Sequence, residues 1–419
     1  MSSKRNAKYQ KTMEYILIFL RHMKSKRYND IYDLLYNIRT NDLREMLENL
    51  GPDHFYYRTV LEILSNPALE YCYSEALYNL AVILGEKANV PALIRHGALD
   101  VILSFKASTN NRILHNACWC LFGIAASDPD HRKLCIDNGV LELAVNLMLT
   151  SAEDNIVDIC GQIIYGIFHM RPYPTYEMAK PFFDHIVELL KLPENSLKYI
   201  LWSLHFGTTE KPEILKSLNV ESCLNPLIKS QQSTLLIPLM IIIAAIFKIT
   251  STDLHEYLNA LKSPLTHYDA NVRLQTCRTV AEYVRNESSI DDMLNGGVYE
   301  IVIKMSNEDD QRVKEQAVYA ILRGFGLGSR VQKQKLATIG GLEVILNYSA
   351  VAASPFNSNL LDCMDSLVEE DYEFFSKKLK EINAVNIFYK LLASNDQVLT
   401  SKAANLLGLV GDEYSKDIF

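Results

Sequence analysis

A two-part unit that recurs about every forty residues constrains the fold of this chain more than any other feature of its sequence. One part is a short apolar stretch opened by glycine or another small residue, which occurs at residues 96–103, 138–145, 296–303 and 340–346. The other is a longer stretch with small residues among large apolar ones, which occurs at residues 75–82, 116–123 and 315–322. We interpret both parts as helices, one short and one long, in each repeat.

The spacing of the long stretches identifies the repeat class. Equivalent points are separated by roughly 41, 43, 37, 42, 37 and 41 residues, and these points are Val82, Gly123, Gly166, Ser203, Ala245, Glu282 and Arg323. Armadillo and HEAT repeats have periods of ~40–47 residues, whereas tetratricopeptide and ankyrin periods of ~34 and ~33 do not fit. The sequence therefore predicts an all-α fold, a right-handed superhelical armadillo-repeat solenoid of about nine to ten repeats.

Small side chains in the long helices are expected to let neighbouring repeats approach closely. A single repeat cannot bury its apolar faces alone, so each repeat stacks on the next and the core runs along the array. The expected close contacts involve Ala76, Ala117, Cys160 and Ala317. The sharp turns between helices are expected at Gly97, Gly139, Gly297 and Gly341.

The domain organisation follows from where this pattern begins and ends. We interpret residues 1–12 as a basic arm, with its mobility left open, and residues 13–419 as one armadillo-repeat domain. Within that domain, residues 13–52 form an irregular N-terminal cap and residues 384–419 a C-terminal cap. We expect one domain because no Ser-, Gly- or Pro-rich linker divides the chain.

Composition and motifs argue against several function classes. The chain has 42 basic and 50 acidic residues, a net charge of -8, which argues against direct nucleic-acid binding as its main function. Its eight cysteines form no two CxxC pairs, and its ten histidines show no HxxxH or HExxH spacing, so we predict no metal and no cofactor. No phosphate-binding or nucleophile motif is present, so we predict no enzymatic activity.

Two features bear on location. The longest apolar run, residues 235–249, is too short to span a bilayer, and no secretory signal pattern opens the chain, so we expect a soluble protein without membrane contact. Most cysteines lie among apolar helix residues, as expected of reduced thiols in the cytoplasm or nucleus.

Three stretches resemble importin-α, the family of adaptors that carry proteins with basic nuclear localisation signals to the nuclear pore. Residues 116–126 resemble a tryptophan-containing helix of that family, and residues 314–321 resemble another of its helices. Residues 171–177, followed by residues 182–190, are similar to a proline-containing insertion in the family's middle repeats, which is the most specific of the three. The resemblance covers roughly residues 55–415.

The resemblance implies a ladder of side chains along a concave groove. In the family, tryptophans flank the lysine and arginine stems of an extended peptide, and an asparagine four residues later binds the peptide backbone. The aligned pairs here are Tyr78/Val82, Trp119/Gly123, Gln162/Gly166, Tyr199/Ser203, Ile241/Ala245, Arg278/Glu282 and Tyr319/Arg323. One tryptophan is kept and no asparagine is, while Trp202 lies outside this register and is expected in the core.

These alignments define the candidate site. The predicted cargo-binding residues are Tyr78, Trp119, Gln162, Tyr199, Tyr319, Asp128, Asp130 and Glu282, with Asp128 and Asp130 as partners for cations of the cargo. The competing interpretation of the aromatic residues is that they belong to the core, where aromatic side chains at helical spacing are usually found.

The resemblance implies an importin-α-like adaptor that binds a protein cargo for nuclear import, in the cytoplasm and the nucleus. It also implies an importin-β partner bound through the basic N-terminus, which the short arm leaves open. The alternative is an armadillo scaffold or assembly protein that has lost transport and binds one specific protein partner.

Overall fold

The computed structural model describes residues 2–40, 54–250, 255–308, 310–351 and 356–410. Helices are the regular elements throughout these residues, and none of the described residues lies in a β-strand, which confirms the all-α solenoid class. Contacts between Cα atoms group the chain into two compact units, Met1–Lys211 and Pro212–Phe419, called unit 1 and unit 2 below. The single repeat domain expected over residues 13–419 stays a prediction.

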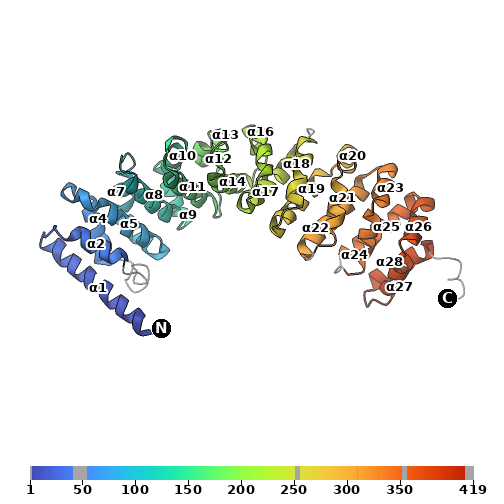
Figure 1. Cartoon of the computed structure of the whole chain (residues 1–419), viewed down its shortest axis with the longest axis horizontal. Helices are drawn as coiled ribbons and strands as arrows, with labels where there is room; N and C mark the ends of the chain where they lie inside the picture. The colour runs from blue at the N-terminus through green and yellow to red at the C-terminus, as the bar shows by residue number, and fades with distance from the viewer. Residues whose placement is uncertain (1, 41–53, 251–254, 309, 352–355, 411–419) are drawn as a thin grey trace. The chain divides into compact units, whose positions relative to one another are not determined.

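Unit 1 alternates short and long helices (Figure 1). Its elements are α1 (Ser2–Lys24), α2 (Ile31–Thr40), α4 (Phe55–Leu64), η1 (Pro67–Cys72), α5 (Tyr73–Leu84), η2 (Lys87–Asn89), α6 (Val90–Arg95), α7 (Ala98–Leu103), α8 (Asn111–Ala125), α9 (Pro129–Asp137), α10 (Val140–Thr150), α11 (Asp154–Phe168), α12 (Tyr176–Phe183), α13 (Ile186–Leu189) and α14 (Glu194–Thr208).

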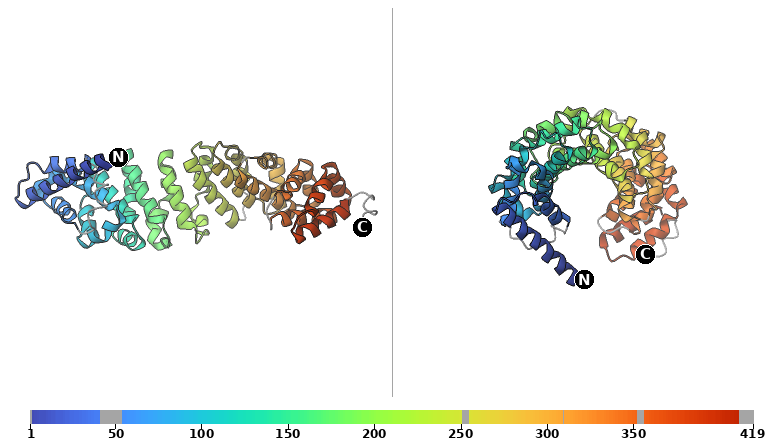
Figure 2. Two further views of the ribbon diagram at one scale, coloured as in Figure 1. Left: turned by 90° about the horizontal axis from the view of Figure 1, so that it is seen from below. Right: turned by 60° about the vertical axis from the view of Figure 1, so that its left-hand side comes forward.

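The long helices of unit 1 form one layer. Helix α5 packs on α8, α8 on α11, and α11 on α14, and Figures 1 and 2 show these repeats following one another in chain order. Small side chains lie at these contacts as predicted: Ala76, Ala117 and Cys160 are all buried. Each long helix also carries half-buried side chains that leave part of the helix open to solvent, and we call this part its free face.

Left-handed residues directly precede the short helices α7, α10, α21, α24 and α27. Gly97, Gly139 and Gly297 have φ values of 78°, 76° and 69°, a conformation that glycine adopts without strain. The expectation for Gly341 was wrong by one residue, since Gly340 has the positive φ of 105° and Gly341 already begins helix α24. Asn383 takes the same place before α27, with a φ of 64°.

Helix α1 crosses the boundary that we expected at residue 12. It runs from Ser2 to Lys24 without a break, so residues 2–12 continue the helix of the cap. Ile16 and Phe19 are fully buried, and the Phe19 ring meets the ring of Tyr56 on α4 edge-on at 5.5 Å. The second half of α1 is therefore part of the core of unit 1. Residues 41–52 of the predicted cap lie outside the described residues.

Unit 2 repeats the same pattern. Its elements are α15 (Ile214–Leu218), α16 (Glu221–Leu224), η3 (Asn225–Lys229), α17 (Ser233–Ile249), α18 (His255–Leu265), α19 (Ala270–Tyr283), α20 (Glu287–Asn295), α21 (Val298–Met305), α22 (Gln311–Leu327), α23 (Arg330–Thr338), α24 (Gly341–Ser349), α25 (Phe356–Glu370), α26 (Tyr372–Glu381), α27 (Ala384–Leu392) and α28 (Gln397–Val410). Its long helices α17, α19, α22, α25 and α28 contact one another in that order.

The apolar run at residues 235–249 lies inside α17, where most of its large side chains are buried against neighbouring helices. Among the described residues, no helix combines the length and the apolar character needed to cross a bilayer. Helices α27 and α28 occupy the predicted C-terminal cap, whose last residues, 411–419, lie outside the described residues.

Candidate functional site

The eight predicted site residues fall into two sets, one in each unit. Unit 1 holds Tyr78 on α5, Trp119 on α8, Gln162 on α11 and Tyr199 on α14, together with Asp128 and Asp130 at the start of α9. Unit 2 holds Glu282 on α19 and Tyr319 on α22.

In unit 1 the predicted aromatic residues lie on the free face of the long helices. Tyr78, Trp119 and Tyr199 are half-buried, as is Gln162, so none of the four belongs to the closed core. The rings of Tyr78 and Trp119 meet edge-on with their centroids 5.3 Å apart, which joins the faces of α5 and α8. That all four residues form one row along a groove stays a prediction.

A second aromatic row, which the sequence analysis missed, lies beside the first. Phe122, Tyr165 and Trp202 follow the predicted positions on α8, α11 and α14 by three residues each, and all three are half-buried. The expectation that Trp202 lies in the core was therefore wrong. The signal was present in the sequence, because residues three apart share one face of a helix. The Tyr165 ring lies 6.3 Å from that of Tyr199 and links the two rows.

A stack of three rings extends these rows at the ends of the helices. Phe206 on α14 stacks on Trp202 at 5.6 Å and on Tyr173 at 5.8 Å, with interplanar angles of 23° in both pairs. Tyr173 comes from the proline-containing segment between α11 and α12. The buried guanidinium of Arg132 holds that segment, donating to the carbonyl oxygens of Met170 at 2.6 Å and Pro172 at 2.5 Å.

We call this surface the aromatic face and define it by Tyr78, Trp119, Phe122, Tyr165, Tyr173, Tyr199, Trp202 and Phe206. Two histidines border it. His169 stacks on Tyr165 at 5.2 Å, and His205 contacts both Trp202 and Phe206. Burial lowers the pKa of His205, which favours its uncharged form at neutral pH.

The positions four residues after the first row are closed by helix packing. Gly123 lies so close to α5 that a Cβ atom there would stand 3.0 Å from both the carbonyl oxygen and the Cβ of Leu84. A Cβ on Gly166 would stand 3.3 Å from the Phe122 ring, and Ser203 is fully buried. These are the positions at which the importin-α pattern has its asparagines. In this chain they serve contact between long helices.

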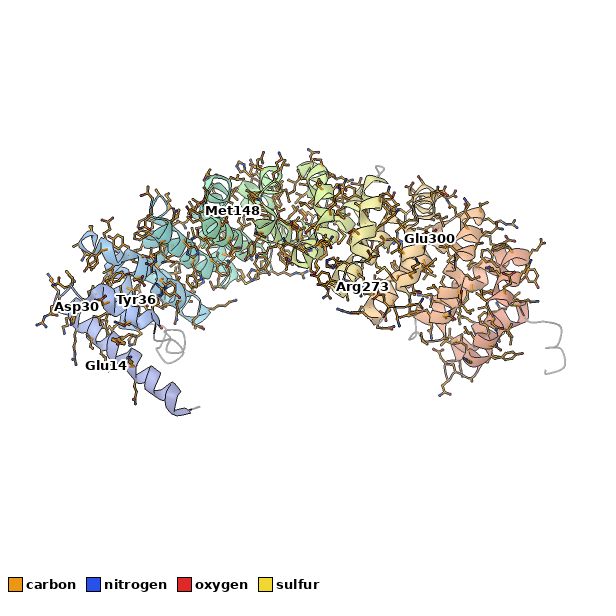
Figure 3. The ribbon with its side chains drawn as sticks, in the orientation of Figure 1. Glu14, Asp30, Tyr36, Met148, Arg273 and Glu300 are labelled. Atoms are coloured by element: carbon orange, nitrogen blue, oxygen red, sulfur yellow. The ribbon has the colours of Figure 1, made fainter. Side chains whose placement is uncertain are left out.

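The chain's own arginine covers the ring of Tyr78. The guanidinium carbon of Arg39, on α2, lies 4.0 Å from the Tyr78 centroid and 5.9 Å from that of Tyr36, which Figure 3 labels. Arg39 also pairs with the carboxylate of Glu75 at 3.0 Å, and Arg112 from α8 pairs with the same group. The Glu75 side chain is 0% exposed, so its charge is neutralised inside unit 1.

A lysine covers the ring of Tyr199 in the same way. The Nζ atom of Lys198 lies 4.6 Å from the Tyr199 centroid and 3.9 Å from the Asp158 carboxylate. The side-chain amide of Gln162 donates to the other oxygen of Asp158 at 2.7 Å. Burial, reinforced by the charge of Asp158, raises the pKa of Tyr199. Gln162, a predicted groove residue, therefore orients the Asp158 carboxylate, which already pairs with Lys198.

The two predicted aspartates begin helix α9. Asp128 is its N-cap, and one carboxylate oxygen accepts the backbone N–H groups of Asp130 and His131, both at 2.9 Å. Burial alone would raise the pKa of Asp128, but these bonds and the nearby His131 ring outweigh it and lower the pKa. Asp130 is exposed in the first turn of the helix. Their role toward a cargo stays a prediction.

The set in unit 2 is also internally paired. Tyr319 is 38% exposed, and the guanidinium carbon of Arg323 lies 6.0 Å from its ring centroid. Glu282 lies 3.3 Å from the Nζ of Lys248 and 3.9 Å from Arg323. Arg323 also donates two hydrogen bonds to the carbonyl oxygen of Val284, at 2.8 and 3.1 Å. Glu282 therefore bridges three successive long helices.

Metal-ligating side chains do not gather in the described part of the chain. No group of three or more His, Cys, Asp or Glu side chains there is placed to hold a metal ion. All eight cysteines are free thiols, and six of them are buried.

Comparison with known proteins gives low-identity similarity to one family. No family model matches the chain. It is 22% identical over 225 residues to importin subunit alpha-1b of Oryza sativa subsp. japonica, covering 51% of this chain and 41% of that protein. It is 24% identical over 149 residues to importin subunit alpha-2 of Arabidopsis thaliana, covering 35% of this chain and 28% of that protein. The chain is therefore similar to importin-α subunits at low identity, over 35% to 55% of its length.

The chain spans less than half the length of the curated relatives that it matches. Among solved structures it resembles an engineered protein from the Northeast Structural Genomics Consortium, with a TM-score of 0.71 at 19% identity, covering 90% of this chain and 96% of that one. That likeness concerns the fold.

Proposed function

We propose that the aromatic face of unit 1 binds an extended segment of a protein partner, and that the chain acts as a binding protein without enzymatic activity. The observation that carries this proposal is the run of half-buried aromatic rings over four successive long helices, from Tyr78 on α5 to Phe206 on α14. Partly exposed aromatic side chains that recur on successive helices are typical of protein interaction sites.

The repeat of the face fits an extended ligand. Packed helices lie about 8–10 Å apart, so the three steps from α5 to α14 span about 30 Å. An extended chain rises about 3.1–3.4 Å per residue, so about ten residues would reach all four helices. Tryptophan and tyrosine are the residues whose truncation most often costs 2 kcal/mol or more at such interfaces, which makes Trp119 and Trp202 the expected anchors.

The finer proposal is that the bound segment belongs to a cargo for nuclear import, which would place the chain in the cytoplasm and the nucleus. Its support is the family-like stretches at residues 116–126, 171–177 and 314–321 and the similarity to importin-α subunits. The second candidate is a scaffold that binds one specific partner and takes no part in transport. The closed positions at Gly123 and Gly166 favour that candidate, because they exclude the backbone-binding asparagines of the family pattern.

Intrinsic fluorescence tests the binding proposal directly, since the chain's two tryptophans, Trp119 and Trp202, both lie on the aromatic face. Extended peptides selected from an unbiased displayed library should shift this fluorescence saturably. Trp119→Ala should abolish their binding in protein with unchanged circular dichroism. Phe55→Ala is the matched control, because Phe55 is an aromatic residue of unit 1, 72% exposed on α4 and outside the face. Selected peptides that bind Trp119→Ala and Trp202→Ala as well as wild type would refute the proposal.

A second experiment separates transport from scaffolding. Importin-β should be retained by the wild-type chain and lost when Lys4, Arg5, Lys8 and Lys11 are replaced by glutamine. Substitution is preferable to truncation through residue 27, because removing Ile16 and Phe19 would open the core of unit 1. If wild-type protein retains no importin-β, the scaffold candidate stands in place of the import adaptor.

A further inference from the structure

We infer that the aromatic face selects an uncharged, proline-rich segment in the polyproline II conformation rather than a lysine-rich one. This inference rests on the proposed function and specifies the ligand class of the same surface. Three independent properties of the face lead to it: the pairing of its charges, the closure of its backbone-binding positions, and the spacing of its helices.

A cation of the chain itself already lies over three of the four tyrosine rings of the face, those of Tyr78, Tyr173 and Tyr199. The guanidinium of Arg39 already lies over Tyr78. Its carboxylate partner, Glu75, is buried and pairs with both Arg39 and Arg112. Lys198 likewise lies over Tyr199 with Asp158 as its partner. A lysine arriving at either ring would meet a like charge, and the carboxylate that could offset it is engaged.

The backbone of a strand-like peptide would also lack partners on this face. Gly123 lies four residues after Trp119, at the position where the family pattern has an asparagine, and it carries no side-chain amide. The corresponding residues, Gly166 on α11 and Ser203 on α14, are buried. The amide of Gln162 is used by Asp158. A proline-rich segment suffers least from this lack, because proline has no backbone N–H and polyproline II has a fully solvated backbone without internal hydrogen bonds.

Spacing favours the same conformation. Polyproline II has three residues per turn and rises about 3.1 Å per residue, so equivalent side chains recur about every 9.3 Å. That distance matches the 8–10 Å between packed helices, whereas alternate side chains of a β-strand recur about every 6.8 Å. A proline at every third position would therefore meet α5, α8, α11 and α14 in turn.

The rings themselves suit proline. Trp119 and Trp202 are half-buried, so each leaves part of its indole ring accessible to a proline side chain. Proline-rich segments dock on aromatic-lined grooves of this kind in several classes of binding domain, and their preformed conformation lowers the entropy cost of binding.

The test compares three peptides of about twelve residues, one with proline at every third position between neutral residues, one lysine-rich and one glutamate-rich. Each is titrated into the full chain, with tryptophan fluorescence and calorimetry as readouts. The proline-rich peptide should bind saturably and about tenfold or more tightly than the other two, and Trp202→Ala should weaken it by about tenfold or more. Trp202→Phe should restore most of the binding, and Phe55→Ala should leave it unchanged.

Lys198→Met checks the charge argument separately. It removes the cation over Tyr199 and releases Asp158, so the affinity of the lysine-rich peptide should rise relative to wild type. If the lysine-rich or the glutamate-rich peptide binds wild-type protein most tightly and depends on Trp202, the inference is wrong while the proposed function stands. If none of the three binds folded protein, the inference is wrong, and only the library selection then decides the proposed function.

Discussion

Restoring an asparagine at Gly123 is the obvious way to rebuild the family's peptide clamp, and the structure predicts that it damages the fold instead. Gly123 is the residue four positions after Trp119 on α8. A side chain there would begin with a Cβ atom 3.0 Å from the carbonyl oxygen and the Cβ of Leu84 on α5. The carbonyl oxygen belongs to the backbone and Cβ is the first carbon of the side chain. A rotamer change of Leu84 moves neither atom, so it cannot relieve the contact.

The expected magnitude follows from two opposing effects. Overpacking at a close helix contact costs about 1–3 kcal/mol. Replacing a helical glycine by alanine gains up to about 1 kcal/mol. Gly123→Ala should therefore lower the stability of unit 1 by about 1–2 kcal/mol, which is about 2–8 °C in Tm for a unit of this size. Gly123→Asn should cost more, because asparagine adds further atoms and recovers less helix propensity.

Gly326→Ala is the control. Gly326 is also a helical glycine, near the end of α22, but a Cβ there would meet nothing within 4 Å. That variant should be neutral or gain about 0.5 kcal/mol. Tryptophan fluorescence during thermal unfolding reports unit 1, and circular dichroism reports the whole chain. If Gly123→Ala raises the thermal unfolding midpoint, the inferred close approach of α8 to α5 is wrong.

Arg112→Ala leaves the buried Glu75 carboxylate with Arg39 as its remaining partner, and chemical denaturation should show a loss of about 1–2 kcal/mol in unit 1. Arg132→Ala removes two hydrogen bonds to carbonyl oxygens of the segment before α12, so stability should fall by about 3 kcal/mol and the fluorescence of the folded protein should change as the ring stack loosens. Burial raises the pKa of the Cys135 and Cys277 thiols to about 12 each. Thiols of the unfolded chain titrate near ~8.5, so the unfolded chain loses these protons at lower pH than the folded protein does. These thiols should therefore leave the urea unfolding midpoint unchanged below about pH 8 and lower it as pH rises from about 8.5 toward 12. Replacing both cysteines by alanine should flatten that decline.

The sequence predicted the layer of long helices well because the physical signal was repeated. Every anchor point of the forty-residue spacing lies in a long helix of the structure, from Val82 in α5 to Arg323 in α22. Glycine turns were predictable for the same reason, since glycine adopts without strain the left-handed conformation that precedes α7, α10, α21 and α24. The error at Gly341 arose from a pair of glycines, of which the first takes the turn.

The second aromatic row was harder to predict, because it depends on which flank of each helix the next helix covers. Residues three and four positions after Trp119 differ by one step of about 100° around the helix. Phe122 is half-buried on the free face, whereas Gly123 lies against α5. The family pattern has its second functional residue four positions after the first row. This chain instead places aromatic rings three positions after it.

The paired cations could not be found from the sequence at all. Arg39 comes from a helix outside the aligned repeats, and Lys198 precedes Tyr199 directly, a spacing that does not place two side chains together on a straight helix. Only the bend of a long lysine side chain toward Asp158 brings its Nζ over the ring. The position of a long, flexible cationic side chain depends on how three elements pack together. No periodic pattern in the sequence predicts that position.

Loss of the asparagines and gain of the second aromatic row are two consequences of one change in packing. A small residue at the fourth position lets successive long helices approach, as Gly123 does against Leu84 and Gly166 against Phe122. That approach removes the space in which an amide could reach a peptide backbone. It also leaves Phe122, Tyr165 and Trp202 as the side chains that define the free face. A ligand for such a surface must gain its affinity from ring contact rather than from backbone hydrogen bonds, which is the physical reason to expect a partner different from the basic signals of the family.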